Sequence, residues 1–226
     1  QHPVGLDDGD SWRGLRLFRD NWYYFKEHHL YQHRYGLDPN PITGDGEIRL
    51  ISAARGAASS RTIVEVYDWL VVLDKFGVYR FNGYDLAHVS GPIDSILKEL
   101  DWSKSERFHA VHHRQGNRHQ VRFFVCSAGE SYPQTEIVWD YRTNDWTINT
   151  YKQEIHDSLA VNDSNGVHRT FVCDGVKHLL ALDMGALDAA PHGNGTVAGT
   201  ITGYTAAFGL AASAASFYTS GNGLVG

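Results

Sequence analysis

The sequence has few cysteines and no long apolar or basic run, and each of these absences excludes a class of protein. Two cysteines, Cys126 and Cys173, are too few for the disulfide framework of a small secreted domain, so we expect two buried free thiols. No apolar segment reaches the roughly 18 residues that a membrane-spanning helix needs. The formal net charge is -6 and basic residues form no cluster, which argues against binding to nucleic acid phosphates.

The two ends of the sequence lack the usual terminal signals. Residues 1–20 contain no apolar core of the kind found in secretory signal peptides, and the first residue is not methionine. The last residues, "SGNGLVG", contain no capping element. We expect both ends to be cuts from a longer polypeptide.

Catalytic motifs are also missing. The sequence has neither a Gly-x-Ser-x-Gly nucleophile elbow nor a Walker phosphate loop. Its acidic residues lie mostly at the expected ends of strands, where aspartate is a common turn residue, instead of forming the convergent set that a glycosidase needs. Examples are Asp74, Asp140, Asp145, Asp174 and Asp183. We therefore predict no catalytic residues, no cofactor and no enzymatic activity.

Aromatic residues and glycines are frequent, with 6 Trp, 12 Tyr, 10 Phe and 23 Gly. This composition favours many short strands and tight turns over long helices. Four segments, which start at Asn21, Asp68, His119 and Val167, can be laid over one another. Each has an apolar strand, a short turn and a second strand, and they recur at roughly the period of four-stranded propeller blades.

The predicted fold is therefore all-β, with β-propeller blades of four antiparallel strands in a segment of a longer chain. The blades are expected within residues 1–184, near 15–51, 61–90, 107–151 and 155–203. A short helical insertion is predicted over Gly91–Leu100, as a plain packing helix in preference to an interaction helix. Residues 185–226 are rich in Gly, Ala, Thr and Ser, and form either an arm or the start of an additional small β module; within them, 196–202 alternates like a strand.

The segment "FGVYRFNGYDL" illustrates the structural motif of the blades. Tyr79 and Phe81 alternate with Arg80, so we expect the two aromatic rings to pack between blades and the arginine to face outward. Glycines on either side are expected to set the turns. The full set of predicted motif residues is Gly77, Tyr79, Phe81, Gly83, Trp139, Asp140 and Trp146.

The 13 histidines raise the question of a metal site. His109 and His113 would share one face of a strand, which makes them the metal candidates within "FHAVHHRQGNRH". No Cys, Asp or Glu lies inside this cluster to complete a tetrahedral site, so we favour solvated strand-edge histidines and predict no bound metal. The adjacent His28 and His29 are expected to face opposite ways on a strand.

Three stretches of the sequence resemble the β-propeller virion proteins of tailed bacteriophages, of the tail nozzle, tail tube or neck "stabilisation" type. They are "NWYYFKEHHLYQHRYG", residues 56–93 with Gly-Val-Tyr-Arg-Phe-x-Gly, and "VWDYRTNDWT". The tail segment "AASFYTSGNGLVG" resembles a short module that interrupts or follows such propellers. The departures from the family pattern are the histidine-rich turns and the incomplete number of blades.

The resemblance implies a structural component of the virion, located in a neck or tail ring through which DNA is delivered. The implied partners are copies of the same chain in a ring and neighbouring portal, adaptor or tail proteins. DNA would pass through the lumen without specific binding, and no membrane is involved. The alternative is a carbohydrate- or host-receptor-binding tail component on a propeller scaffold, which a cluster of exposed Trp and Tyr on one face would favour.

Overall fold

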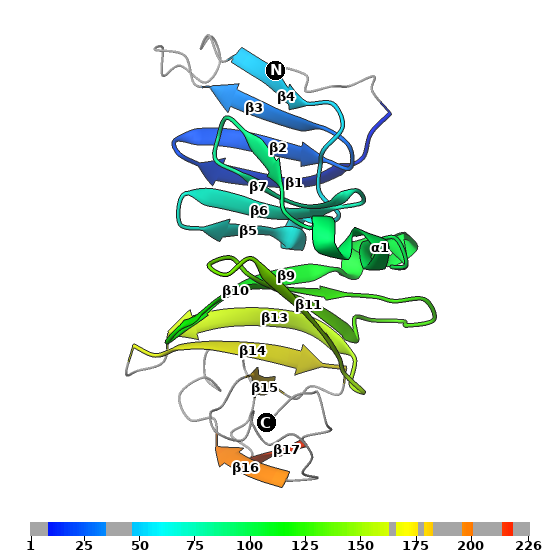
Figure 1. The fold of residues 1–226 in the computed structure, drawn as a ribbon, viewed down its shortest axis with the longest axis vertical. Helices are drawn as coiled ribbons and strands as arrows, with labels where there is room; N and C mark the ends of the chain where they lie inside the picture. The colour runs from blue at the N-terminus through cyan, green and yellow to red at the C-terminus, as the bar shows by residue number, and fades with distance from the viewer. Residues whose placement is uncertain are drawn as a thin grey trace. The chain divides into compact units, whose positions relative to one another are not determined.

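The computed structural model describes residues 9–34, 47–162, 166–175, 179–182, 196–200 and 214–218. These residues form an all-β structure of antiparallel sheets with one short α-helix, as predicted (Figure 1). The chain divides into two compact units, Gln1–Ala110 and Val111–Gly226. None of the helices formed by the described residues has the length and hydrophobicity of a membrane span.

The first sheet of the first unit has the strand order β1-β2-β3-β4. Its strands are β1 (Trp12–Phe18), β2 (Asn21–Lys26), β3 (Leu30–Arg34) and β4 (Glu47–Ser52). A two-residue turn joins β1 to β2, and both of its residues, Arg19 and Asp20, have positive φ (48° and 59°). This backbone twist matches that of the flanking strands, which is why such turns close hairpins well.

The second sheet of this unit repeats the arrangement, with the order β5-β6-β7-β8. Its strands are β5 (Ile63–Val66), β6 (Trp69–Asp74), β7 (Gly77–Phe81) and β8 (Leu86–His88). The two sheets share one apolar core, whose buried residues are Phe18, Tyr23, Phe25, Leu30, Ala57, Ile63, Leu70, Val72, Tyr79 and Phe81. Burial of this many large side chains is the dominant favourable contribution to the stability of the pair.

Short helical segments precede and follow the second sheet in the chain. They are the 3-10 segments η1 (Ser60–Thr62), η2 (Gly91–Ile93) and η3 (Trp102–Arg107), and the single turn α1 (Asp94–Leu97). The helix predicted over 91–100 is thus shorter than expected, because Asp101 accepts from the Ser103 backbone N–H and begins η3 soon after Leu97. Its apolar side chains Ile93 and Leu97 are buried, as a packing helix requires.

The third sheet has the order β12-β11-β10-β9, and β9 continues across the boundary between the units. Its strands are β9 (His109–Gln115), β10 (Arg118–Val125), β11 (Thr135–Asp140) and β12 (Asp145–Thr150). A three-stranded sheet follows, formed by β13 (Ile155–Asn162), β14 (His168–Asp174) and β15 (Leu179–Leu182). An apolar core of the second unit joins these two sheets and contains Val111, Phe124, Tyr151, Ile155, Val172 and Leu182.

The last sheet is a pair, β16 (Thr196–Thr200) with β17 (Ala214–Tyr218). The range 155–203, predicted to form one blade, therefore contains three strands of one sheet and a strand, β16, that pairs elsewhere. The rest of 185–226 lies outside the described residues. Both cysteines are free thiols, as predicted, although Cys173 is only half-buried.

Candidate functional site

The predicted motif residues of the second sheet lie in and around β7. Gly77 has φ +135°, and a Cβ built on it would lie 2.5 Å from both His88 Nε2 and Ser90 Oγ, so only glycine fits there. Tyr79 is buried, and its hydroxyl donates to the carbonyl of Gly56. Tyr79 thereby ties β7 to the segment that precedes η1.

Phe81 and Gly83 connect this sheet to the first one. The Phe81 ring is fully buried and contacts Tyr23 of β2 edge to face, with ring centroids 5.0 Å apart. Gly83 has φ +98°, and its carbonyl accepts from the Tyr23 hydroxyl at 3.4 Å. These contacts are structural, because they place no reactive group at the surface. Arg80 is half-buried and lies 4.6 Å over the Trp69 ring instead of pointing freely outward.

The motif residues of the third sheet form the β11–β12 hairpin. Trp139 is buried and stacks on Trp146, with ring centroids 5.8 Å apart and an interplanar angle of 17°. The Trp139 Nε1–H donates to Asn144 Oδ1 at 3.1 Å. Asp140 Oδ1 accepts from the backbone N–H of Arg142, so it acts as a turn former.

His109 and His113 are both buried, which corrects the expectation of solvated strand-edge histidines. His109 Nδ1 donates to the Arg107 carbonyl at 3.1 Å, and His113 Nδ1 lies 2.7 Å from Thr170 Oγ1. Burial, together with the nearby charge of Arg122, lowers the pKa of His113 to about 2, so the ring is neutral at physiological pH. Among the described residues, neither histidine belongs to a group of three or more possible ligands that could hold an ion.

Two buried carboxylates form ion pairs inside the protein, one in each unit. In the second unit, Glu136 pairs with Arg122 at 3.4 Å and also accepts from Asn149 Nδ2 and the Tyr151 hydroxyl. In the first unit, Asp74 at the end of β6 pairs with Arg55 at 3.2 Å. Burial raises the pKa of Asp74 to about 6, and the attraction of Arg55 only partly offsets it.

One face of the first sheet carries mostly apolar side chains that are exposed or partly exposed; we call it the open face. It carries two rows of residues paired across the strands: Leu15, Tyr24, Tyr31 and Leu50, and then Leu17, Trp22, His33 and Ile48. Trp12, with 54% of its surface exposed, lies next to Tyr24. Lys26 Nζ lies 5.4 Å from the centroid of the Trp12 ring. The opposite face of the same sheet supplies Tyr23, Phe25 and Leu30 to the core.

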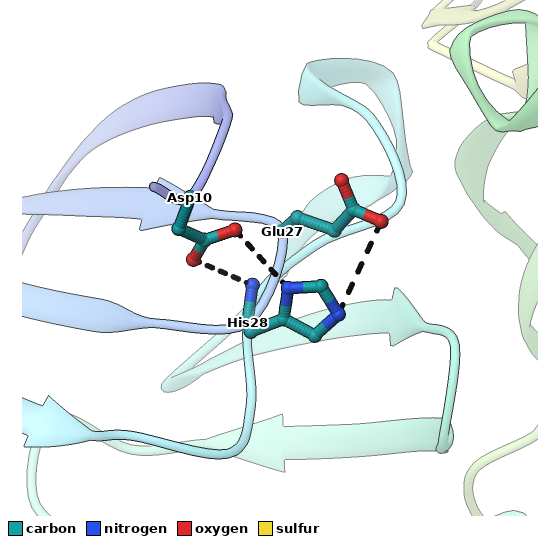
Figure 2. Close-up of side chains that lie close together, drawn as sticks. All are labelled: Asp10, Glu27 and His28. Atoms are coloured by element: carbon teal, nitrogen blue, oxygen red, sulfur yellow. Dashed lines mark hydrogen bonds and ion pairs between the residues drawn. The ribbon is translucent and has the colours of Figure 1, made fainter. Parts of the chain in front are cut away.

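A cluster of ionisable side chains lies where the chain enters β1 and where β2 turns into β3. His28 and His29 occupy that turn, not a strand, and both rings reach Asp10. His28 Nδ1 donates to Asp10 Oδ1 at 3.1 Å, His29 Nδ1 donates to Asp10 Oδ2 at 2.7 Å, and the His28 backbone N–H donates at 2.9 Å. Figure 2 shows the His28 ring between the carboxylates of Asp10 and Glu27, with His28 Nε2 4.0 Å from Glu27 Oε1.

The electrostatics of this cluster favour an ionised Asp10. Its side chain is only 4% exposed, and burial alone would raise the pKa. The hydrogen bonds from His29 and from the backbone and ring of His28 outweigh that effect, so the pKa of Asp10 lies below its ordinary value. The other carboxylate, Glu27, accepts from Arg13 Nη2 at 2.6 Å. Arg13 and Glu27 also line a cavity of about 250 Å³, together with Lys75 and Trp102.

Sequence reasoning missed this cluster because it treated the two adjacent histidines as strand residues. The signal was present as the acidic segment "DDGD" ahead of one strand and "EHH" after the next. Adjacent strands of a hairpin bring such ends together, which alternation within a single strand does not reveal. Compared with known proteins, the chain matches no family model and no curated protein.

Proposed function

We propose that the chain is a structural component of a bacteriophage virion, built on β-propeller blades and forming part of a neck or tail ring through which DNA is delivered. The observation that carries this proposal is the sheet order. Three consecutive sheets have four antiparallel strands each, joined in sequence order, and neighbouring sheets share apolar cores within each unit. Sequential four-stranded sheets packed face to face are the building plan of a propeller.

The open face of the first sheet supports the view that more blades belong to the assembly. Blades of a propeller bury both faces, and the opposite face of this sheet packs against the second sheet in that way. Apolar patches of this kind on a soluble protein mark contact surfaces. A further sheet on the open face would cover Trp12, Leu15 and Leu17, which are otherwise exposed.

The test is to locate the chain in a particle. Virions made by the organism that encodes the chain are purified, and their proteins are digested with trypsin and identified by mass spectrometry. The peptide 81–98, "FNGYDLAHVSGPIDSILK", has no internal Lys or Arg and serves as the marker. We expect it in the virion fraction. Its absence from purified particles contradicts the proposal.

A second candidate function, carbohydrate or host-receptor binding by a tail component, is favoured by the aromatic residues of the open face. Trp12, Trp22, Tyr24 and Tyr31 are available in part to stack on sugar rings there. A glycan array probed with the protein and with Trp12→Ala separates the two functions. Saturable glycan binding that Trp12→Ala abolishes supports this candidate, and the lack of any glycan binding leaves the scaffold function.

A further inference from the structure

The ring of His28 is held so that one of its nitrogen atoms faces a second carboxylate. Its Nδ1–H is used by the hydrogen bond to Asp10, which leaves Nε2 as the lone-pair nitrogen. Nε2 lies 4.0 Å from Glu27 Oε1, which is too long for a hydrogen bond. Zinc binds His nitrogen and carboxylate oxygen at about 2.0–2.2 Å in tetrahedral geometry, so two ligand atoms of one ion lie about 3.4 Å apart. A shift of roughly 0.6 Å by these two partly exposed side chains would bring His28 Nε2 and Glu27 Oε1 to that separation.

Asp10 supplies a feature that metal-binding histidines usually have. A histidine that binds a metal through one ring nitrogen donates its other N–H to a carboxylate or carbonyl, which fixes the ring and increases its basicity. The hydrogen bond from His28 Nδ1 to Asp10 Oδ1 matches this arrangement, and the buried Asp10 carboxylate is itself held by His29 and by the His28 backbone N–H.

The local charge and exposure also suit a cation. Asp10 and Glu27 contribute two negative charges, and Arg13, which pairs with Glu27 through Oε2, contributes one positive charge and leaves Oε1 directed at His28. The ligand atoms of Asp10, Glu27 and His28 all lie within 4.8 Å of one another. His28 is 41% exposed, so an ion that keeps some of its water molecules can reach the ring.

We propose that Glu27 and His28 bind a divalent transition-metal ion such as Zn²⁺, and that Asp10 is the positioning residue that orients His28 for it. Both ligands of the ion would lie in the β2–β3 turn. Asp10, in the segment before β1, would contact the site through its hydrogen bond with His28. Carboxylate and imidazole donors together favour Zn²⁺ or Ni²⁺ over Mg²⁺, which prefers an all-oxygen octahedral shell.

The experiment is calorimetric titration of the 226-residue protein with Zn²⁺ and, as a comparison, with Mg²⁺. We expect one saturable Zn²⁺ site and no Mg²⁺ binding over the same range. His28→Gln and Glu27→Gln should remove the site, and Asp10→Asn should weaken it about 10- to 100-fold, as loss of an orienting carboxylate does. The control is the double variant Glu154→Gln/His156→Gln, since this is another His–Glu pair, at 3.3 Å, and among the described residues it belongs to no group of three or more possible metal ligands.

Two-dimensional NMR of the same protein with substoichiometric Ni²⁺ locates the ion, because a paramagnetic ion broadens signals of nearby residues. We expect broadening centred on residues 10, 27 and 28 in the native protein and none there in His28→Gln. The proposal is overturned by any of three results: no saturable Zn²⁺ binding up to about 1 mM, equal loss of binding in the control variant, or broadening centred elsewhere. Retained folding of each variant is checked from the dispersion of the same spectra.

Discussion

The buried carboxyl of Asp74 should make the stability of the first unit depend on pH. Asp74 lies at the end of β6 with its side chain 1% exposed, and its pKa is raised from 3.8 to about 6. Burial is the main cause, because it penalises the charged form. The variant Asp74→Asn keeps the shape of the side chain and an oxygen that accepts from the Phe76 backbone N–H, but it cannot ionise.

The sign and size of the effect follow from the two pKa values. Between about pH 4 and pH 6, the folded protein holds a proton on Asp74 that the unfolded chain has lost, so stability falls as the pH rises through this window. The full shift of about two pKa units corresponds to roughly 3 kcal/mol. The contribution of this group is therefore most favourable below about pH 4, and the roughly 3 kcal/mol is lost by about pH 7.

The assay is urea unfolding of the native protein, Asp74→Asn and Asp85→Asn at several pH values from about 4 to 7.5. Asp85 is an exposed aspartate in the connection between β7 and β8 and serves as the control. We expect the difference in unfolding free energy between Asp74→Asn and the native protein to move in favour of the variant by about 3 kcal/mol as the pH rises, with no such trend for Asp85→Asn. A carbon-13 titration that places the Asp74 carboxyl near pH 4, or a pH-independent difference, refutes the reasoning.

Three further predictions concern the packing of the sheets. Gly77→Ala should lower the unfolding free energy by about 1–3 kcal/mol or more, because the backbone there has positive φ and no space for a Cβ; thermal unfolding measures the loss. Phe81→Ala should lower the unfolding free energy by about 3–5 kcal/mol, whereas Phe76→Ala, at a ring that is 55% exposed, should lower it by less than about 1 kcal/mol. Equal losses of the two variants in urea unfolding would contradict the assignment of Phe81 to the core. Glu136→Ala should cost about 3–5 kcal/mol because it leaves Arg122 buried without its carboxylate; the double variant with Arg122→Leu should recover part of this loss in the same urea assay.

Short apolar and aromatic segments were sufficient to predict strands such as β6 and β7, but they did not give the length of the helix that follows. β6 and β7 were predicted correctly because "WLVVL" and "GVYRF" are short, rich in Val and aromatics, and separated by a two-residue turn, with Gly77 at the start of β7. The four-stranded grouping followed from the recurrence of such pairs with a strand on either side. The short α1 was overestimated because the i, i+3, i+4 spacing continues to Leu100 although the helix itself ends at Leu97.

The site residues show the limit of reasoning from single segments. His109 and His113 were correctly placed on one strand, yet their burial depends on neighbouring strands such as β14, which supplies Thr170. The Asp10 cluster depends on two segments that are 18 residues apart and meet only when the hairpin forms. Period and composition report on the conformation of one segment, whereas such contacts depend on how segments pair.

The sequential strand order of the sheets has a consequence for folding. Within β1–β4, β5–β8 and β9–β12, every strand pairs with strands adjacent to it in the sequence, and the described residues exchange no strand between these three sheets. The entropy cost of closing each loop is therefore small, and contacts of short sequence separation form quickly. Each sheet can assemble as soon as its own segment has left the ribosome, without waiting for the residues that follow. The same independence means that a whole sheet can be duplicated or inserted in the gene without changing the strand pairing of its neighbours.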